Sequence, residues 1–138
     1  MLLKSLKLKD FRQFKGEQSV VFSTDPDKNV TIIMGENGSG KTTFAQAFTW
    51  CLYGATDFDD KMLLCKATRQ KMMPGDEEKV RVEIELTHNG TDYTVIREQM
   101  YKVEIADLYH QKMPYSILHT KIKMVRESLL TSLKLNYA

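Results

Sequence analysis

Alternating apolar and polar residues predict strands on either side of a central helix. In the first stretch, one parity carries Leu2, Leu6 and Leu8, and the other carries Ser5, Lys7 and Lys9. This alternation is typical of a half-buried strand. A second strand is predicted around residues 18–22. The β-branched run at 30–34 predicts a third strand, buried in a parallel sheet.

After this run the apolar period changes from a strand spacing to a helix spacing. Phe44, Phe48 and Leu52 recur at intervals of four, as they would on one face of a helix. Gly54 can adopt the left-handed conformation that ends a helix, so we expect the helix to stop there. The chain between the predicted strand and the predicted helix therefore has a strand-loop-helix setting.

The clearest alternation begins at Val80 and predicts a hairpin over residues 80–97. Apolar and polar residues alternate strictly through residue 87, and a returning apolar strand follows at 93–96. Asn89 and Gly90 between them favour a tight turn of type I′.

Two further helices are predicted in less regular stretches. Asp57, Asp59 or Asp60 can cap a short, locally basic helix that continues through Met72. Residues 104–138 predict an amphipathic basic helix whose apolar stripe is a packing face. The stripe consists of Leu118, Ile122, Val125, Leu129 and Leu133.

Composition indicates a globular chain and says little about partners. Its 138 residues are enough for one domain, or part of one, and 42% are hydrophobic and 28% charged. A net charge of +2 does not by itself indicate nucleic-acid binding. Cys51 and Cys65 stand outside any metal-binding spacing, so we expect both to be reduced. The N-terminus lacks the apolar core of a signal peptide, and no membrane-spanning stretch follows, which predicts a cytoplasmic protein.

Residues 35–42 read Gly-Glu-Asn-Gly-Ser-Gly-Lys-Thr, which fits the phosphate-binding pattern G-x-x-x-x-G-K-[ST] at every required position. The glycines lack a Cβ, so the backbone can turn sharply and bring its N–H groups close to a phosphate chain. Lys41 has the charge and reach for the β- and γ-phosphates. The hydroxyl of Thr42 can ligate Mg²⁺.

Two separated pieces of the chain carry a family resemblance. They are Leu-Lys-Asp-Phe-Arg-Gln-Phe at residues 8–14 and the loop at 35–42 with the helix that runs to Gly54. Together they resemble the N-terminal part of an SMC-like ATPase head of the ABC type, with the DndD and SbcC families of DNA-processing ATPases as the nearest look-alikes. The resemblance implies an α/β, P-loop NTPase lobe with a mixed sheet and an antiparallel hairpin over residues 1–102. Residues 103–138 would be a helical C-terminal segment that is divergent or truncated.

The resemblance also implies cofactors, site residues and partners. The cofactors are ATP and Mg²⁺, with Lys41 as the catalytic residue and Thr42 as the metal ligand. Arg12 would approach the nucleotide from the end of the first strand. The implied partners are the C-terminal half of the head, or a second head in a dimer, and DNA, with no membrane. The implied nucleotide-binding set is Arg12, Gly35, Asn37, Gly38, Ser39, Gly40, Lys41, Thr42 and Thr43.

The chain departs from the family pattern after the hairpin. No glycine follows Gly90, so a Gly-rich signature loop is absent, and so is an apolar strand ending in acidic residues. Because these elements orient water and metal for hydrolysis, we expect this chain to bind ATP without hydrolysing it alone. The favoured interpretation is the ATP-binding N-terminal half of a head that acts in DNA repair or DNA-modification-linked processing. The alternatives are a transporter-type nucleotide-binding domain and a non-catalytic interaction fragment.

Overall fold

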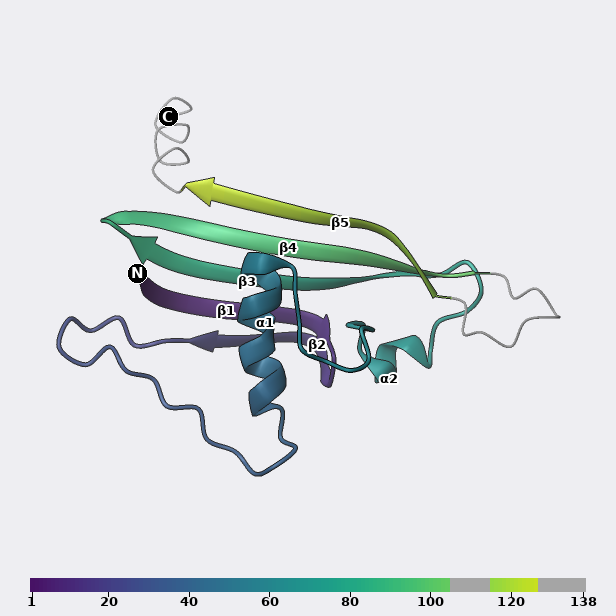
Figure 1. The fold of residues 1–138 in the computed structure, drawn as a ribbon, viewed down its shortest axis with the longest axis horizontal. Coiled ribbons are helices and arrows are strands. Elements are labelled where there is room, and N and C mark those ends of the chain that lie inside the picture. Colours follow the sequence, from purple (N-terminus) through teal and green to yellow (C-terminus); the bar gives the residue numbers. More distant parts are fainter. Residues whose placement is uncertain (105–114, 127–138) are drawn as a thin grey trace.

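The computed structural model describes residues 1–104 and 115–126, which form one five-stranded sheet with a long helix across one face (Figure 1). The strand order is β2-β1-β3-β4-β5, and every neighbouring pair is antiparallel. The elements are β1 (Leu2–Phe11), β2 (Phe14–Val21), α1 (Lys41–Tyr53), α2 (Lys66–Arg69), β3 (Glu77–His88), β4 (Thr91–Val103) and β5 (Tyr115–Arg126).

The hairpin of β3 and β4 confirms the sequence prediction, and both strands are longer than predicted. Pairing continues without a shift from Glu77↔Lys102 to His88↔Thr91. Asn89 and Gly90 have φ angles of 49° and 70°, and a type I′ turn requires a positive φ at both positions. The alternate apolar residues of β3 face the core, where the side chains of Val80, Val82 and Ile84 are fully buried.

Helix α1 packs on the sheet and ends where the sequence predicts. Gly54 has a φ of 74°, and its N–H donates to the carbonyl of Trp50 at 2.8 Å. Trp50 and Cys51 are buried against the sheet, and the Cys51 thiol donates to the carbonyl of Val82 at 3.5 Å. Burial raises the pKa of this thiol to about 11, so Cys51 is a small neutral core residue. Cys65 is also buried and free, as expected.

Residues 30–34 form no strand, so the prediction of a buried parallel strand is wrong. Val30 and Met34 are 77% and 87% exposed. A local hydrogen bond connects this stretch to the end of β2, where the N–H of Ser23 donates to Oγ1 of Thr31 at 3.0 Å. A buried strand needs neighbouring strands for its backbone groups, and β2, the nearest strand in sequence, pairs only with β1 among the described residues. Residues 30–34 therefore have the composition of a strand, but no described strand pairs with them.

Residues 115–126 form β5, which corrects the prediction of an amphipathic helix over 104–138. The strand pairs with β4 from Val103↔Tyr115 to Tyr93↔Arg126. Without β5, the edge of β4 would have unpaired backbone groups, so pairing outweighs the helical spacing of the apolar residues. The β-branched residues in this stretch suit a strand. Residues 105–114 and 127–138 lie outside the described residues, and so does the rest of the predicted helix.

Helix α2 is much shorter than the helix predicted to continue through Met72. The chain before it is held extended by backbone contacts with the end of β1. The N–H of Arg12 donates to the carbonyl of Leu63 at 2.7 Å, and the N–H of Cys65 donates to the carbonyl of Asp10 at 2.9 Å. These bonds hold residues 63–65 in an extended conformation beside Phe11, as an isolated antiparallel bridge. Helical structure therefore begins only at residue 66.

Candidate functional site

The glycine-rich loop at residues 35–40 leads directly into α1. Gly38 and Gly40 have φ angles of 83° and 102°, in the left-handed region that residues with side chains rarely adopt. Gly40 has a second reason to be glycine, because an added Cβ would lie 2.9 Å from Cζ of Phe14. The two glycines therefore allow the loop to turn close to the β1–β2 turn.

Lys41 folds its side chain back over this loop. Its ammonium group donates to the carbonyl of Glu36 at 3.0 Å and to the carbonyl of Gly35. The N–H of Ser39 also donates to the Glu36 carbonyl, at 3.1 Å, and closes a turn. These contacts keep one positive charge at the centre of the loop.

The loop and the start of α1 surround a cavity of about 210 Å³. The first N–H groups of α1 have no acceptors within the helix, and Gly40 before it provides no side-chain cap for them. The positive end of the helix, these N–H groups and Lys41 together favour an anion. The lining consists of Gln13, Glu36, Asn37, Gly38, Gly40, Lys41, Thr42 and Thr43. Of the predicted nucleotide-binding residues, Gly35 and Ser39 instead take part in the loop's own contacts.

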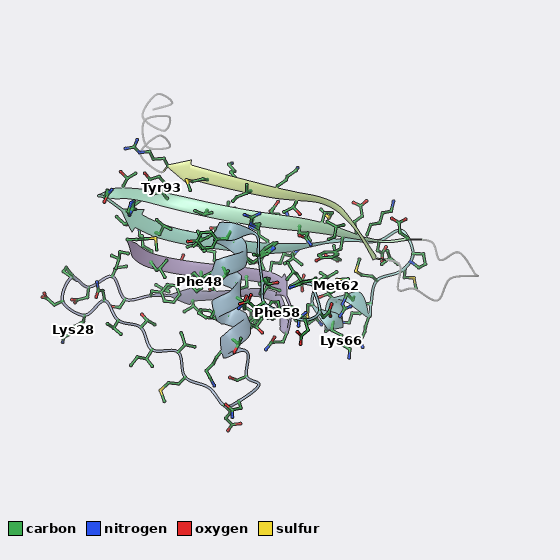
Figure 2. The ribbon with its side chains drawn as sticks, in the orientation of Figure 1. Lys28, Phe48, Phe58, Met62, Lys66 and Tyr93 are labelled. Carbon is green, nitrogen blue, oxygen red and sulfur yellow. The ribbon has the colours of Figure 1, made fainter. Side chains whose placement is uncertain are left out.

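Arg12 lies in a neighbouring cavity of about 280 Å³ rather than in the loop cavity. Its guanidinium donates to the carbonyls of Met62 and Asp60 at 2.7 and 3.1 Å. It also stacks over the ring of Phe58, 4.3 Å from the centroid. Phe58 and Met62 lie beside α2, near one end of β1 (Figure 2). In this structure Arg12 fastens the 58–62 segment to the β1–β2 turn.

Gln13 is a site residue that the sequence analysis missed. It follows Arg12 in the β1–β2 turn and lines both the loop cavity and the Arg12 cavity. Its Oε1 accepts a hydrogen bond from the Thr43 hydroxyl at 2.8 Å, across thirty positions of sequence. Gln13 belongs to the sequence at 8–14 that carries the family resemblance, but nothing in that pattern assigns it to the loop cavity, because the fold is what places it there.

Tyr101 supports the same turn from the core. Its side chain is almost fully buried, and its hydroxyl accepts from the N–H of Leu63 at 3.2 Å and from Nε2 of Gln99 at 2.6 Å. Burial raises the pKa of the Tyr101 hydroxyl and outweighs the two hydrogen bonds, which lower it. Because Leu63 in turn accepts from the N–H of Arg12, a hydrogen-bonded path leads from β4 to the site.

Replacing Tyr101 with phenylalanine is expected to lower the free energy of unfolding by about 1–3 kcal/mol, because it leaves buried donors without their acceptor. Urea unfolding followed by Trp50 fluorescence measures the change. Tyr53→Phe is the matched control, since Tyr53 is 78% exposed and should tolerate the same substitution. Equal stability of the two variants would contradict a supporting role for the Tyr101 hydroxyl.

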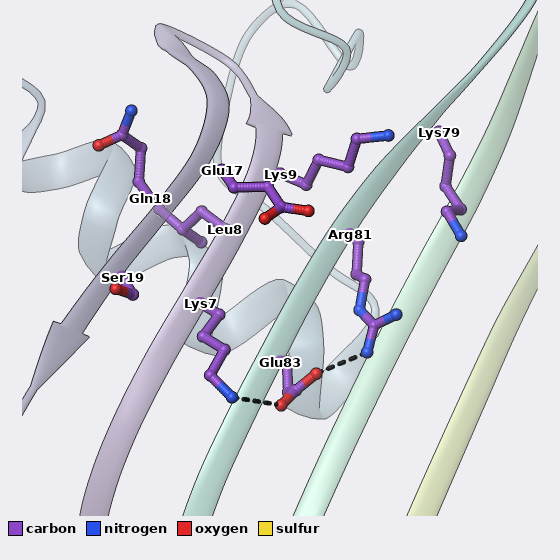
Figure 3. A pocket seen from close by; sticks show the side chains of 9 residues that line it. All are labelled: Lys7, Leu8, Lys9, Glu17, Gln18, Ser19, Lys79, Arg81 and Glu83. Carbon is purple, nitrogen blue, oxygen red and sulfur yellow. Dashed lines mark hydrogen bonds and ion pairs between the residues drawn. The ribbon is translucent and has the colours of Figure 1, made fainter.

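The face of the sheet opposite α1 carries a larger cavity, of about 630 Å³, in which Glu83 pairs with Lys7 and Arg81 (Figure 3). The ammonium group of Lys7 donates to Glu83 and Glu85, each at 3.0 Å, and Arg81 donates to Glu83. Partial burial raises the pKa of Glu83, but the hydrogen bonds from Lys7 and Arg81 outweigh burial and hold the pKa below the ordinary value. Since Lys7, Lys79 and Arg81 in this cavity already face carboxylates, it is a weaker candidate for anions than the loop cavity.

Within residues 1–104 and 115–126, no group of histidine, cysteine, aspartate and glutamate side chains is arranged to hold a metal ion. No helix in these ranges is long and apolar enough to cross a membrane.

The fold and the loop cavity define an α/β protein with a glycine-rich loop before its main helix. A family model described as "AAA domain" matches residues 5–134, so the chain belongs to the AAA domain family. Together with the relatives below, this match confirms the resemblance to an SMC-like ATPase.

Three relatives carry ATPase names. The chain is 29% identical, over 94% of its length, to a "DNA double-strand break repair Rad50 ATPase" of Methanocaldococcus jannaschii. It is 28% identical, over 72% of its length, to a protein of the same name in Methanococcus maripaludis. Over 40% of its length it is 38% identical to the "Retron Vc95 probable ATPase" of Vibrio cholerae. The aligned part spans 12%, 9% and 10% of these three proteins, respectively.

Proposed function

We propose that the chain binds Mg·ATP in the loop cavity, as the N-terminal lobe of an SMC-like ATPase head of the ABC type. The head would act in DNA repair or in DNA-modification-linked processing, and the names of the two Rad50 relatives support the first of these. The lobe would comprise residues 1–102, as the sequence predicts. β5 extends the same sheet beyond that boundary.

The observation that carries the proposal is the meeting of three anion-binding features at one cavity. These are a loop with two left-handed glycines, the ammonium group of Lys41 and the uncapped start of α1. When a polyphosphate is bound, the N–H groups from Asn37 to Thr43 would surround it, and Lys41 would move from the loop carbonyls to the β- and γ-phosphates. Thr42 lines the cavity and would ligate Mg²⁺, which supplies charge neutralisation of the phosphates.

A partner lobe is part of the proposal. The exposed run at 30–34 has the β-branched composition of a buried strand, and strands from the C-terminal half of a head would pair with it and cover it. A second head would then close over the bound nucleotide, with DNA as the partner of the whole protein. Hydrolysis would need a Gly-rich signature loop and an acidic strand end, which the partner lobe would supply.

The chain alone is therefore expected to bind ATP without steady turnover. The described residues offer a phosphate-binding cavity, and phosphoryl transfer to water also needs an oriented nucleophile, which this proposal assigns to the partner lobe. Release of inorganic phosphate, followed under excess Mg·ATP, tests this. Sustained release that Lys41→Ala abolishes would contradict it.

Calorimetric titration of the purified chain tests the binding function with three ligands. Mg·ATP is expected to give saturating heat, Mg·tripolyphosphate is expected to compete with it, and adenosine is expected to give none, because the cavity's donors suit phosphate oxygens. A folded chain that gives no heat with Mg·ATP would overturn the proposal. So would a chain that binds adenosine as tightly as ATP.

A second candidate function is non-catalytic binding of another protein. The exposure of Ile32 and Met34, at 77% and 87%, favours it because these apolar side chains invite a covering partner. This function predicts partner binding that is unaffected by ATP.

A further inference from the structure

The β1–β2 turn presents a side-chain amide to the loop cavity in a fixed orientation. Thr43, in the first turn of α1, is 7% exposed, and its hydroxyl donates to Oε1 of Gln13 at 2.8 Å. A glutamine amide has an acceptor oxygen on one side and two N–H donors on the other. With the oxygen used by Thr43, the donors of Nε2 must point elsewhere.

Those donors lie at the loop. A methyl group added at Gly40 would be 2.8 Å from Nε2 of Gln13 and 3.4 Å from Cδ, so the amide lies directly over the last residue before α1. Within the part of the chain that the structure describes, Nε2 has no hydrogen-bond acceptor. Gln13 also lines the same cavity as Lys41 and Thr42. An anion held at the start of α1 would therefore meet two unused donors from the β1–β2 turn.

We propose that Gln13 is a phosphate-contacting residue of the nucleotide site, oriented by Thr43 so that its Nε2 donates to the phosphate chain. The inference rests on the proposed nucleotide binding and adds a contact from outside the glycine loop. Two neighbouring residues of the β1–β2 turn would then have different roles. Arg12 holds the 58–62 segment by hydrogen bonds, and Gln13 would donate to the phosphates beside the glycine loop.

Gln13→Glu is the most direct test. It keeps an oxygen for the Thr43 hydroxyl, but it replaces the two donors with a negatively charged oxygen. Affinity for Mg·ATP and for Mg·tripolyphosphate should both fall about tenfold or more, because a hydrogen bond to a charged phosphate is lost and a repulsion is added. The melting temperature without ligand should stay close to that of the parent, since Gln13 is exposed.

Two further variants separate the phosphate contact from other effects. Gln18→Glu makes the same charge change on β2, at a residue that lines the opposite-face cavity rather than the loop cavity, and it should bind like the parent. Gln13→Lys gives up the Thr43 acceptor but restores a donor, so it should retain polyphosphate binding within about threefold of the parent if the donors are what matters.

The outcomes are distinct from those that test nucleotide binding itself. Parent-like affinity of Gln13→Glu, while Lys41→Ala still loses binding, would overturn the role of Gln13 alone. A loss in Gln13→Glu for Mg·ATP but not for Mg·tripolyphosphate would also overturn it, because the contact would then not be to phosphate. An equal loss in Gln13→Lys and Gln13→Glu would overturn it as well, because restoring a donor at position 13 would then not restore phosphate binding. Absence of binding in the parent would remove both proposals together.

Discussion

Lys41→Ala is expected to weaken Mg·ATP binding by about 10- to 100-fold, the range for losing hydrogen bonds to a charged group. In the structure the ammonium group rests on the carbonyls of Gly35 and Glu36, where it has no carboxylate partner among the described residues. A bound polyphosphate would therefore replace two neutral carbonyl acceptors with charged oxygens. The alanine variant has no ammonium group to make these stronger hydrogen bonds. Calorimetric titration of parent and variant gives the ratio of the two dissociation constants.

Lys28→Ala is the matched control for this change. Lys28 lies in the same connection between β2 and α1 and is exposed, but it does not line the loop cavity (Figure 2). Both variants remove one positive charge, so a general electrostatic effect would appear in both. Equal affinities for Lys41→Ala and Lys28→Ala would contradict the role given to Lys41.

Phe11→Ala is expected to lower the free energy of unfolding by about 3–5 kcal/mol, as truncation of a large buried aromatic residue does. Phe11 is fully buried at the end of β1. Its ring centroid lies 5.8 Å from that of Trp50 and 6.4 Å from that of Phe58. It therefore joins the sheet, α1 and the segment that Arg12 holds, and a cavity at this point would loosen all three.

Urea unfolding of the Phe11 variant, beside Tyr53→Ala, measures this effect. Tyr53 is 78% exposed, and truncating it should change stability by less than about 0.5 kcal/mol. A loss of stability in Phe11→Ala no larger than in Tyr53→Ala would contradict the view that Phe11 anchors the core beneath the site.

Local sequence patterns predict those parts of the fold whose stabilising contacts are close in sequence. The β3–β4 hairpin is specified by alternation on both sides of Asn89 and Gly90, and its turn geometry follows from those two residues. Helix α1 likewise ends at Gly54 because glycine can take the left-handed cap. Each of these elements contains its own start or stop signal.

Two of the wrong predictions concern segments whose state depends on distant partners. Residues 30–34 have the composition of a buried strand, but composition supplies no neighbouring strand, and the segment remains exposed. Residues 115–126 have helical spacing, yet the open edge of β4 makes them a strand. Periodicity reports which faces are apolar, and the available partner decides the backbone.

In the candidate site, too, the residues of a contiguous motif could be predicted, and those that distant contacts bring in could not. Lys41 and Thr42 could be predicted because the phosphate-loop pattern is contiguous and both line the cavity. Gln13 and Tyr101 could not, because they reach the site through a bond to Thr43 and a bond from Leu63, each between residues about thirty or more positions apart. The packing of α1 and of the segment around Leu63 against the sheet brings these residues together.

Residue-resolved amide NMR of the ¹⁵N-labelled chain, titrated with Mg·ATP, tests the central claim most directly. The claim predicts that the amide signals of Gly38, Gly40 and Lys41 shift furthest and saturate together, because their N–H groups would surround the phosphates. Unchanged signals at these residues, with the largest shifts at Lys7 and Arg81 on the opposite face of the sheet, would contradict it.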